Sequence, residues 1–297
     1  MKNIKKIIIS IVFVTAILGG VAFMISQNNT SIKDNGKLKV AASYYPLYDF
    51  AKNIGGNKIS VINMTPPGAE PHDFEPSPKA LADASKSAVF IYNGGNLEPW
   101  TKGYLQDYKH TAIKASTGIA LQAQDPHFWL DPVLAKQVVI NIRDGLIKAD
   151  PANSVYYTYN AADYIVKLAQ LDQDYRNGLA TCQTRTIITS HQAFSYLAKR
   201  YNLDVMAIAG ISTDEEPSAA KLAELSQAVR ADNIKYIFFE SLASPKLADT
   251  IAKETGAKTL VFDPIEGLTN EAQKQGQDYI SVQRQNLANL RTALACQ

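Results

Sequence analysis

The sequence lacks most of the residue patterns that mark hydrolytic enzymes and nucleic-acid-binding proteins. No H-E-x-x-H zinc-protease motif is present among its four histidines. Ser190 and His191 are neighbours, but no nucleophile elbow surrounds them, so a serine hydrolase is not indicated. The formal net charge of the 297 residues is only +2, and no basic stripe with interleaved aromatic residues is present, so we expect no nucleic-acid partner. The sequence therefore predicts no catalytic residues and no enzyme.

The N-terminal segment lacks acidic residues and cysteine. Lys2, Lys5 and Lys6 precede an almost wholly apolar run over residues 7–25. A basic start before such a run indicates a secretory signal peptide or an N-terminal membrane anchor over residues 1–26. No convincing small-x-small cleavage site is present, which slightly favours the uncleaved anchor, and the lack of cysteine excludes a lipid anchor in this segment. We therefore expect an extracytoplasmic protein, in the periplasm or on the outer face of the cytoplasmic membrane.

Cysteine is scarce in the rest of the chain as well, where only Cys182 and Cys296 occur. Two cysteines in an exported chain favour one disulfide bond. The alternative is a pair of reduced thiols that are buried separately. If they are bonded, they attach the C-terminal helix to the start of the second half of the chain.

A polar tether at residues 27–37 precedes a pattern that alternates short apolar runs with helical stretches. We predict an N-terminal α/β lobe over residues 38–150. Its strands are expected at residues 38–43, 59–64, 88–93 and 111–116, and its helices at residues 46–54, 79–85 and 131–148. Strands that alternate with helices indicate a parallel sheet.

The pattern changes at residues 151–181, which show no strand signal. Apolar residues recur there at helical spacing, from Val155 through Tyr159 and Val166 to Leu179, and predict one linking helix on the order of 40 Å long. A second α/β lobe is expected over residues 182–297, with strands at 184–190, 204–209, 235–240 and 258–263 and helices at 193–201, 218–231, 245–255 and 271–295. The fold class is therefore α/β, with two parallel-sheet lobes joined by one long helix.

Three of the four histidines lie where ligands bind in open parallel sheets. His191 and Asp263 directly follow predicted strands of the second lobe, and His72 and His127 lie in loops of the first. Two donors from each lobe would place an ion in the cleft between the lobes. Three neutral imidazoles and one carboxylate complete a tetrahedral shell that suits zinc. His110 has no such context, and we interpret it as an ordinary surface residue.

Acidic residues near these positions have simpler interpretations. Glu70, Asp73 and Glu75 flank His72 and are expected to form a solvated acidic loop. Glu240 ends a predicted strand on the cleft side, where it can accept a hydrogen bond near the ligands. Asp131 is expected to cap the helix that it begins.

Several longer motifs support the same site. They are PPGAEPHDFEPSPK, DPHFWLDP, TSHQAFSYLAKRYNL, EEPSAAKLAEL, FFESLASPKLADTIAKETGA and VFDPIEGL. From about Leu38 to the C-terminus, the chain resembles the zinc- and manganese-binding solute-binding proteins of ABC importers, the cluster A-I or cluster 9 family. The resemblance implies two lobes bridged by a rigid helix, a transported metal ion in the interlobe cleft, and a membrane permease as partner. The family's four ligands correspond here to His72, His127, His191 and Asp263.

The chain departs from the family pattern in one loop. Many zinc members carry a long loop rich in histidine and acidic residues, whereas residues 116–124 are short and contain no histidine. Manganese members typically have glutamate at the third ligand position, where this chain has His191. The resemblance is therefore to the zinc type, with Zn²⁺ as the transported ion and Mn²⁺ as the alternative.

Two other functions compete with metal delivery. A zinc hydrolase could use three histidines and a carboxylate, but only if one coordination position stayed open. A surface adhesin could use the same metal for structure alone. The prediction is an extracytoplasmic, monomeric zinc-binding protein that delivers its ion to an ABC-type importer.

Overall fold

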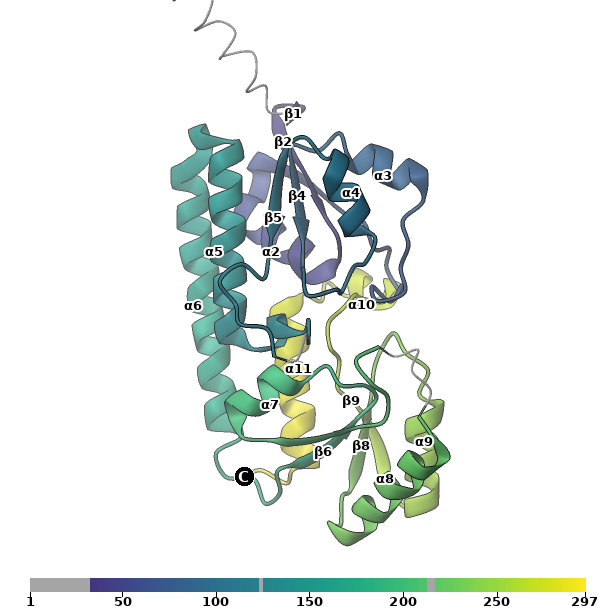
Figure 1. Ribbon diagram of the computed structural model, residues 1–297. Helices are drawn as coiled ribbons and strands as arrows, with labels where there is room; N and C mark the ends of the chain where they lie inside the picture. The colour runs from purple at the N-terminus through teal and green to yellow at the C-terminus, as the bar shows by residue number, and fades with distance from the viewer. Residues whose placement is uncertain (1–32, 123–124, 213–216) are drawn as a thin grey trace, which may run out of the picture.

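The computed structural model describes residues 33–122, 125–212 and 217–297. The predicted signal or anchor segment lies outside these residues. Within the described part of the chain, no helix is long and apolar enough to cross a membrane. Two α/β lobes lie one above the other in Figure 1, and two long helices run side by side along one edge of the molecule.

The first lobe is built on a parallel sheet. Its central strand β2 (Lys37–Ala42) pairs in parallel with β3 (Ile59–Asn63) and with β4 (Val89–Tyr92), and β4 pairs with β5 (Thr111–Lys114). The short strand β1 (Lys33–Asp34) runs antiparallel to the start of β2. The helices of this lobe are α2 (Tyr45–Gly55), α3 (Pro78–Ala84), α4 (Thr101–Asp107) and α5 (Pro132–Ala149).

The second lobe repeats this construction with four parallel strands in the order β7-β6-β8-β9. The strands are β6 (Thr186–Thr189), β7 (Asp204–Ala207), β8 (Tyr236–Phe239) and β9 (Lys258–Val261). The helices are α7 (Ser195–Tyr201), α8 (Ala219–Ala231), α9 (Lys246–Thr255), α10 (Asn270–Lys274) and α11 (Tyr279–Ala293). The predicted fold class, two parallel-sheet lobes and one long helix, is confirmed.

The linking helix α6 (Ser154–Gly178) follows a 3-10 turn at Pro151–Asn153 and is about 37 Å long at 1.5 Å per residue. Its buried side chains contact both lobes. The Tyr164 hydroxyl donates to Asp49 of α2 at 3.0 Å, and the Tyr175 hydroxyl donates to Gln283 of α11 at 2.7 Å. The helix therefore holds the two lobes in a fixed relation.

One hydrophobic core runs through both lobes. Leu38 and Trp129 of the first lobe belong to the same contiguous cluster as Tyr164 of α6 and Leu197 and Phe262 of the second lobe. A wide hinge motion would have to separate these packed side chains and expose apolar surface, at about 25 cal/mol for each Å². We therefore expect only modest movement of the lobes.

The disulfide prediction is confirmed, since Cys182 and Cys296 are bonded. The two residues also form an isolated antiparallel bridge. The bond attaches the end of α11 to the segment that enters β6. It thereby fixes the last helix to the second lobe.

Two local predictions differ from the structure. The last helix was expected to be continuous over residues 271–295, but it is divided into α10 and α11. Gly276 adopts a φ of +72° that ends the first piece, and Asp278 starts the second with a capping box to Ser281. Helix α4 was not predicted, because it is short and contains Gly103. Asp131 caps α5 as expected, accepting from the amide of Val133.

Candidate metal centre

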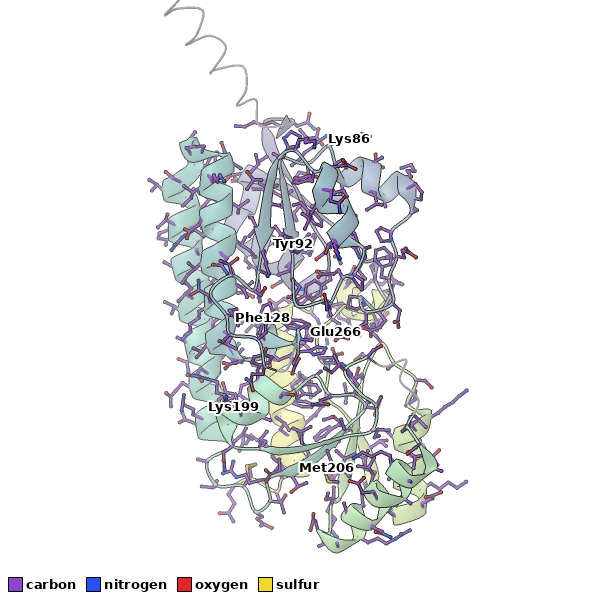
Figure 2. All side chains as sticks on the ribbon, in the orientation of Figure 1. Lys86, Tyr92, Phe128, Lys199, Met206 and Glu266 are labelled. Atoms are coloured by element: carbon purple, nitrogen blue, oxygen red, sulfur yellow. A yellow bond between two sulfur atoms is a disulfide. The ribbon has the colours of Figure 1, made fainter. Side chains whose placement is uncertain are left out.

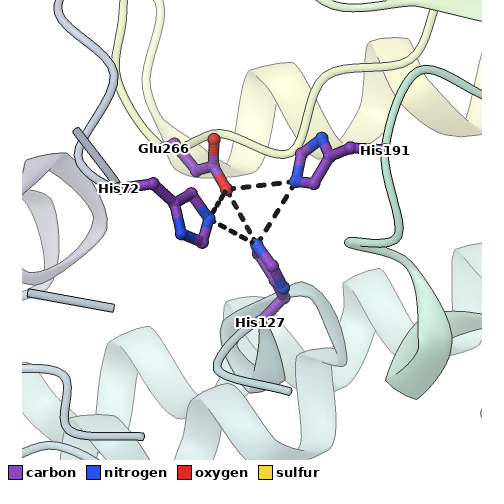
Figure 3. Close-up of side chains that lie close together, drawn as sticks. All are labelled: His72, His127, His191 and Glu266. Atoms are coloured by element: carbon purple, nitrogen blue, oxygen red, sulfur yellow. Dashed lines mark hydrogen bonds and ion pairs between the residues drawn. The ribbon is translucent and has the colours of Figure 1, made fainter. Parts of the chain in front are cut away.

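Three imidazoles and one carboxylate meet between the lobes (Figure 3). The ligand atoms of His72, His127, His191 and Glu266 all lie within 4.8 Å of one another. The Nε2 atom of His127 lies 3.0 Å from Nε2 of His72 and 3.4 Å from Nε2 of His191. Glu266 Oε1 lies 2.9 Å from His127, 3.2 Å from His72 and 3.5 Å from His191.

Most of these separations match the edges of a small tetrahedron. Zinc bonds to nitrogen and oxygen of about 2.0–2.1 Å require donor atoms about 3.3–3.4 Å apart. The distances given above, 2.9–3.5 Å, lie on both sides of that value, and the ligand atoms of His72 and His191 lie within 4.8 Å of each other. The donor set therefore suits a four-coordinate zinc ion.

Loops of both lobes supply the four side chains. His72 lies in the loop that follows β3, and His127 directly precedes the 3-10 helix Phe128–Leu130. His191 follows β6, and Glu266 lies in the loop after β9. Glu266 lies near the centre of the molecule, between the two lobes, close to Phe128 in Figure 2. The structure thus brings together the three histidines that the sequence analysis named as ligands.

The cluster is almost closed to solvent. The side chains of His127 and His191 are 0% exposed, that of Glu266 is 1% exposed and that of His72 is 8% exposed. The second oxygen of Glu266 is buried and has no hydrogen-bond partner among the described residues. An unpaired buried carboxylate oxygen costs free energy, and a bound cation offsets this cost. The unpaired oxygen of Glu266 is thus in keeping with a cation held by this carboxylate.

Two further carboxylates orient the imidazoles. Asp125 Oδ1 lies 2.7 Å from His127 Nδ1, and Glu240 Oε1 lies 2.6 Å from His191 Nδ1. Each carboxylate accepts a hydrogen bond from Nδ1–H, which leaves Nε2 as the nitrogen that binds a metal ion once its own proton is displaced. The sequence-based expectation that Glu240 accepts a hydrogen bond near the ligands agrees with this geometry. Asp125 was missed, although its spacing of two residues from His127 is suited to such a contact.

The charges in the cluster shift the pKa values of its members. Burial alone would raise the pKa of Glu266, but the neighbouring His191, His127 and His72 hold it well below its usual range. Burial alone would lower the pKa of His191, but the carboxylates of Glu240 and Glu266 raise it well above 6.5. The unmetallated site therefore favours imidazolium paired with carboxylate, and a metal ion must displace those protons.

Asp263, the fourth ligand suggested by the sequence, is not part of this cluster, whose carboxylate is that of Glu266. Asp263 Oδ1 instead accepts a 2.7 Å hydrogen bond from the amide of Ile265. Ile265 has a φ of +58°, which is strained for a β-branched residue. The hydrogen bond that the Ile265 amide donates to Asp263 stabilises the turn that directs Glu266 toward the histidines. The rule that ligands follow the ends of parallel strands located the loop after β9 correctly. It could not show that the chain turns over the three residues between Asp263 and Glu266.

The structure also shows the surroundings of Glu70, Asp73 and His110. Both carboxylate oxygens of Glu70 are buried, so the expectation of a solvated loop is wrong for this residue. A cavity of about 600 Å³, lined in part by Glu70, Asp73 and Ser190, lies beside the residues that flank His72 and His191. His110 is exposed and contacts only Tyr108 among aromatic rings of the described residues, as expected of a surface residue.

The chain is similar to known proteins along most of its length. The family model described as zinc-uptake complex component A, periplasmic, matches residues 40–293. The high-affinity zinc uptake system protein ZnuA of Bacillus subtilis is 41% identical over 292 residues, with 91% of each chain covered. The zinc-binding protein AdcA of Streptococcus pyogenes is 40% identical over 287 residues, which cover 86% of this chain and 56% of AdcA. The chain thus spans little more than half of AdcA.

Solved structures give the same result. The Zn(II)-bound ZnuA-like domain of Streptococcus pneumoniae AdcA is 42% identical, with a TM-score of 0.79, and 87% of this chain and 99% of that domain are covered. The laminin-binding protein Lmb of Streptococcus agalactiae, described as a bifunctional protein with adhesin and metal-transporting activity, is 34% identical with a TM-score of 0.81. That match covers 86% of this chain and 99% of Lmb.

Proposed function

The chain belongs to the family of periplasmic zinc-uptake component A, and we propose that it captures a zinc ion outside the cytoplasmic membrane and delivers it to an ABC-type metal importer. The observation that carries this proposal is the buried cluster of three imidazoles and one carboxylate. Its donors come from loops of both lobes, so one chain is sufficient to enclose an ion. Membrane association through the N-terminal segment belongs to the same proposal.

The proposed ligands are His72, His127, His191 and Glu266. A donor set with three imidazoles is softer than a donor set with two carboxylates, and it favours zinc over manganese. The Irving–Williams order acts in the same direction, because manganese is its weakest binder. Zinc is therefore the proposed cargo.

Release requires that the closed shell be opened. The shared core and α6 oppose a wide hinge, so we propose that small displacements of the ligand loops release the ion. A permease that docks across both lobes could strain the four-donor set by moving the His72 loop against the Glu266 loop. This arrangement suits a carrier, whose cargo is held until a partner is engaged.

A carrier also fits the site better than a zinc hydrolase does. Catalytic zinc sites keep an open position for water, whereas four protein donors close a tetrahedral shell. We therefore propose that the chain has no enzymatic activity. Steady-state hydrolysis of ester, amide and phosphate substrates by the zinc-loaded protein tests this point, and turnover that required His191 would contradict it.

The experiment that tests the main proposal is a metal competition. The metal content of the protein, purified without added metal, is measured first, and zinc and manganese then compete at equal free concentrations near neutral pH. We expect zinc to be bound and manganese to be excluded. Equal or tighter manganese binding would contradict the zinc assignment, whereas unchanged zinc uptake in cells that lack the protein would contradict the delivery role.

A further inference from the structure

The outer face of α6 carries an exposed apolar stripe. Among the described residues, five large hydrophobic side chains are exposed, and three of them lie on this helix: Val155 at 82%, Tyr159 at 73% and Val166 at 67% exposure. Ala162 and Ala169 are also exposed. The outer stripe, as we define it, consists of Val155, Tyr159, Ala162, Val166 and Ala169.

The stripe differs from the face that α6 packs against the protein. The buried residues of the helix are Tyr157, Ala161, Tyr164, Leu168, Leu171 and Tyr175. The stripe follows alternating steps of four and three residues, which is the a/d spacing of a coiled-coil seam. With 3.6 residues per turn, this places it on the side of the helix opposite the buried residues. The apolar recurrence that predicted the helix thus combined two faces, of which only one is buried.

Nothing in the fold explains an apolar seam at this place. It lies along the outer edge of the molecule formed by α5 and α6 in Figure 1, on a different element from the loops that carry the metal cluster. It extends for about 21 Å from Val155 to Ala169 at 1.5 Å per residue. Contiguous exposed apolar surface of this kind marks an interaction site.

We propose that the outer stripe is a self-association surface, on which α6 of a second copy packs antiparallel about a two-fold axis near residue 164. In this register Tyr159 of one copy lies opposite Ala169 of the other, and Val166 lies opposite Ala162. Tyr159 and Val166 then each meet an alanine, as close packing of facing positions requires, and Val155 at the end of the stripe lies opposite Gln173. A parallel pair would instead place tyrosine on tyrosine and alanine on alanine, which leaves gaps.

The charges beside the stripe fit the same arrangement. Asp163 and Lys167 form an ion pair at 2.8 Å on one flank of the seam. In the antiparallel pair, Lys167 of each copy lies within one turn of Asp163 of the other, and the two Asp163 carboxylates also approach each other at the axis, each paired with the Lys167 of its own helix. The partly exposed Ile165, on the opposite flank, meets its own copy. In the antiparallel orientation the two helix dipoles also point in opposite directions, which is electrostatically favourable.

The pairing is expected to be weak. A single helix pair of this length lies at the low end of specific interfaces, below about 1,200 Å² of total buried surface. The proposal therefore predicts a protein that is monomeric when dilute and pairs at high local concentration. A two-fold contact between identical surfaces closes on itself and does not form fibres.

Sedimentation velocity over a wide range of protein concentrations tests the proposal. We expect the weight-average sedimentation coefficient to rise with concentration, and Val166→Lys to raise the apparent dissociation constant about tenfold or more, because it places a charge in an apolar seam. Ile62→Lys is the matched control, since Ile62 is an exposed apolar residue on β3 and should leave association unchanged. Zinc titration and circular dichroism of both variants verify that they are folded.

Cysteine cross-linking tests the direction of the helices. Mixing Ala162→Cys with Val166→Cys protein should give a mixed disulfide faster than either variant cross-links with itself. A sedimentation coefficient that does not change with concentration, or association that Val166→Lys leaves intact, would overturn the proposal. Faster cross-linking of each variant to itself would overturn the antiparallel arrangement.

Discussion

The indole Nε1 of Trp129 donates a 2.8 Å hydrogen bond to the carbonyl oxygen of Pro264. Trp129 follows His127 by two residues, and Pro264 precedes Glu266 by two. The bond therefore connects a ligand loop of the first lobe directly to a ligand loop of the second. Trp129 is fully buried, so the bond is shielded from competing water.

We predict that Trp129→Phe weakens zinc binding by about tenfold. The change removes the donor and leaves the buried carbonyl of Pro264 unpaired, which costs about 1–3 kcal/mol. Part of this cost is expressed as looser spacing between His127 and Glu266. Zinc affinity by chelator competition and the dissociation rate into excess chelator are the measurements.

Trp100→Phe provides the matched control for this experiment. Trp100 is the only other tryptophan, and its buried Nε1 has no hydrogen-bond partner among the described residues. The control should therefore leave zinc affinity unchanged. If both variants bound zinc as tightly as the parent protein, the bond between Trp129 and Pro264 would have no part in holding the two loops together.

Glu266 and Asp263 offer a second comparison, because they lie three residues apart in one loop and have different roles. We predict that Glu266→Gln weakens zinc binding by about two orders of magnitude or more, since an anionic donor is lost. Asp263→Asn keeps an oxygen that can accept from the amide of Ile265, so the turn should persist and affinity should fall by about tenfold at most. Calorimetric titration of both variants measures the difference, and the reverse order of effects would restore Asp263 as the ligand.

This loop also shows how far the sequence can locate such a site. The three histidines were predictable because parallel strands end at one edge of a sheet, so loops that follow strands converge. Glu266 was not predictable, because its direction depends on the positive φ of Ile265 and on the hydrogen bond that the Ile265 amide donates to Asp263. Such a turn leaves no periodic signal in the sequence.

The helices illustrate the same limit. The apolar recurrence in residues 151–181 predicts α6 correctly, but it includes Val155, Tyr159 and Val166, which are exposed. Periodicity gives the type of element, whereas burial depends on what the fold packs against each face.

The Cys182–Cys296 bond was predictable because only two cysteines were available for pairing.

The disulfide gives a third prediction. Replacement of both Cys182 and Cys296 by serine should lower the free energy of unfolding by about 4–5 kcal/mol in the chain-entropy model, since the bond closes a loop with a sequence separation of 114 residues. Zinc affinity should stay nearly unchanged, because the bond lies at the end of α11 and not in the ligand loops. Chemical denaturation measures the first effect and chelator competition the second. Titration of two free thiols in the denatured, unreduced parent protein would contradict the bond itself.

The last prediction concerns pH, which should act in opposite directions on the zinc-free and zinc-loaded protein. Burial alone would lower the pKa of His127, but hydrogen bonds to Asp125 and Glu266 raise it above 6.5, and Glu240 and Glu266 raise that of His191 further. Zinc requires neutral imidazoles, so protons compete with it already above pH 6.5. Apparent zinc affinity should fall by about tenfold per pH unit for each imidazole that is protonated in the free site.

The zinc-free protein should respond with the opposite sign. A histidine whose folded pKa is raised contributes stability that is fully present below the unfolded pKa of about 6.5 and is lost as pH rises through the folded pKa. Melting temperature in the presence of a chelator should therefore decrease above pH 6.5, while the increase caused by added zinc should become larger. Glu240→Gln removes one cause of the raised His191 pKa and should move both changes to lower pH, whereas exposed Glu224→Gln should not. Zinc affinity that stays constant between pH 6 and 8 would show that protons and zinc do not compete for these imidazoles.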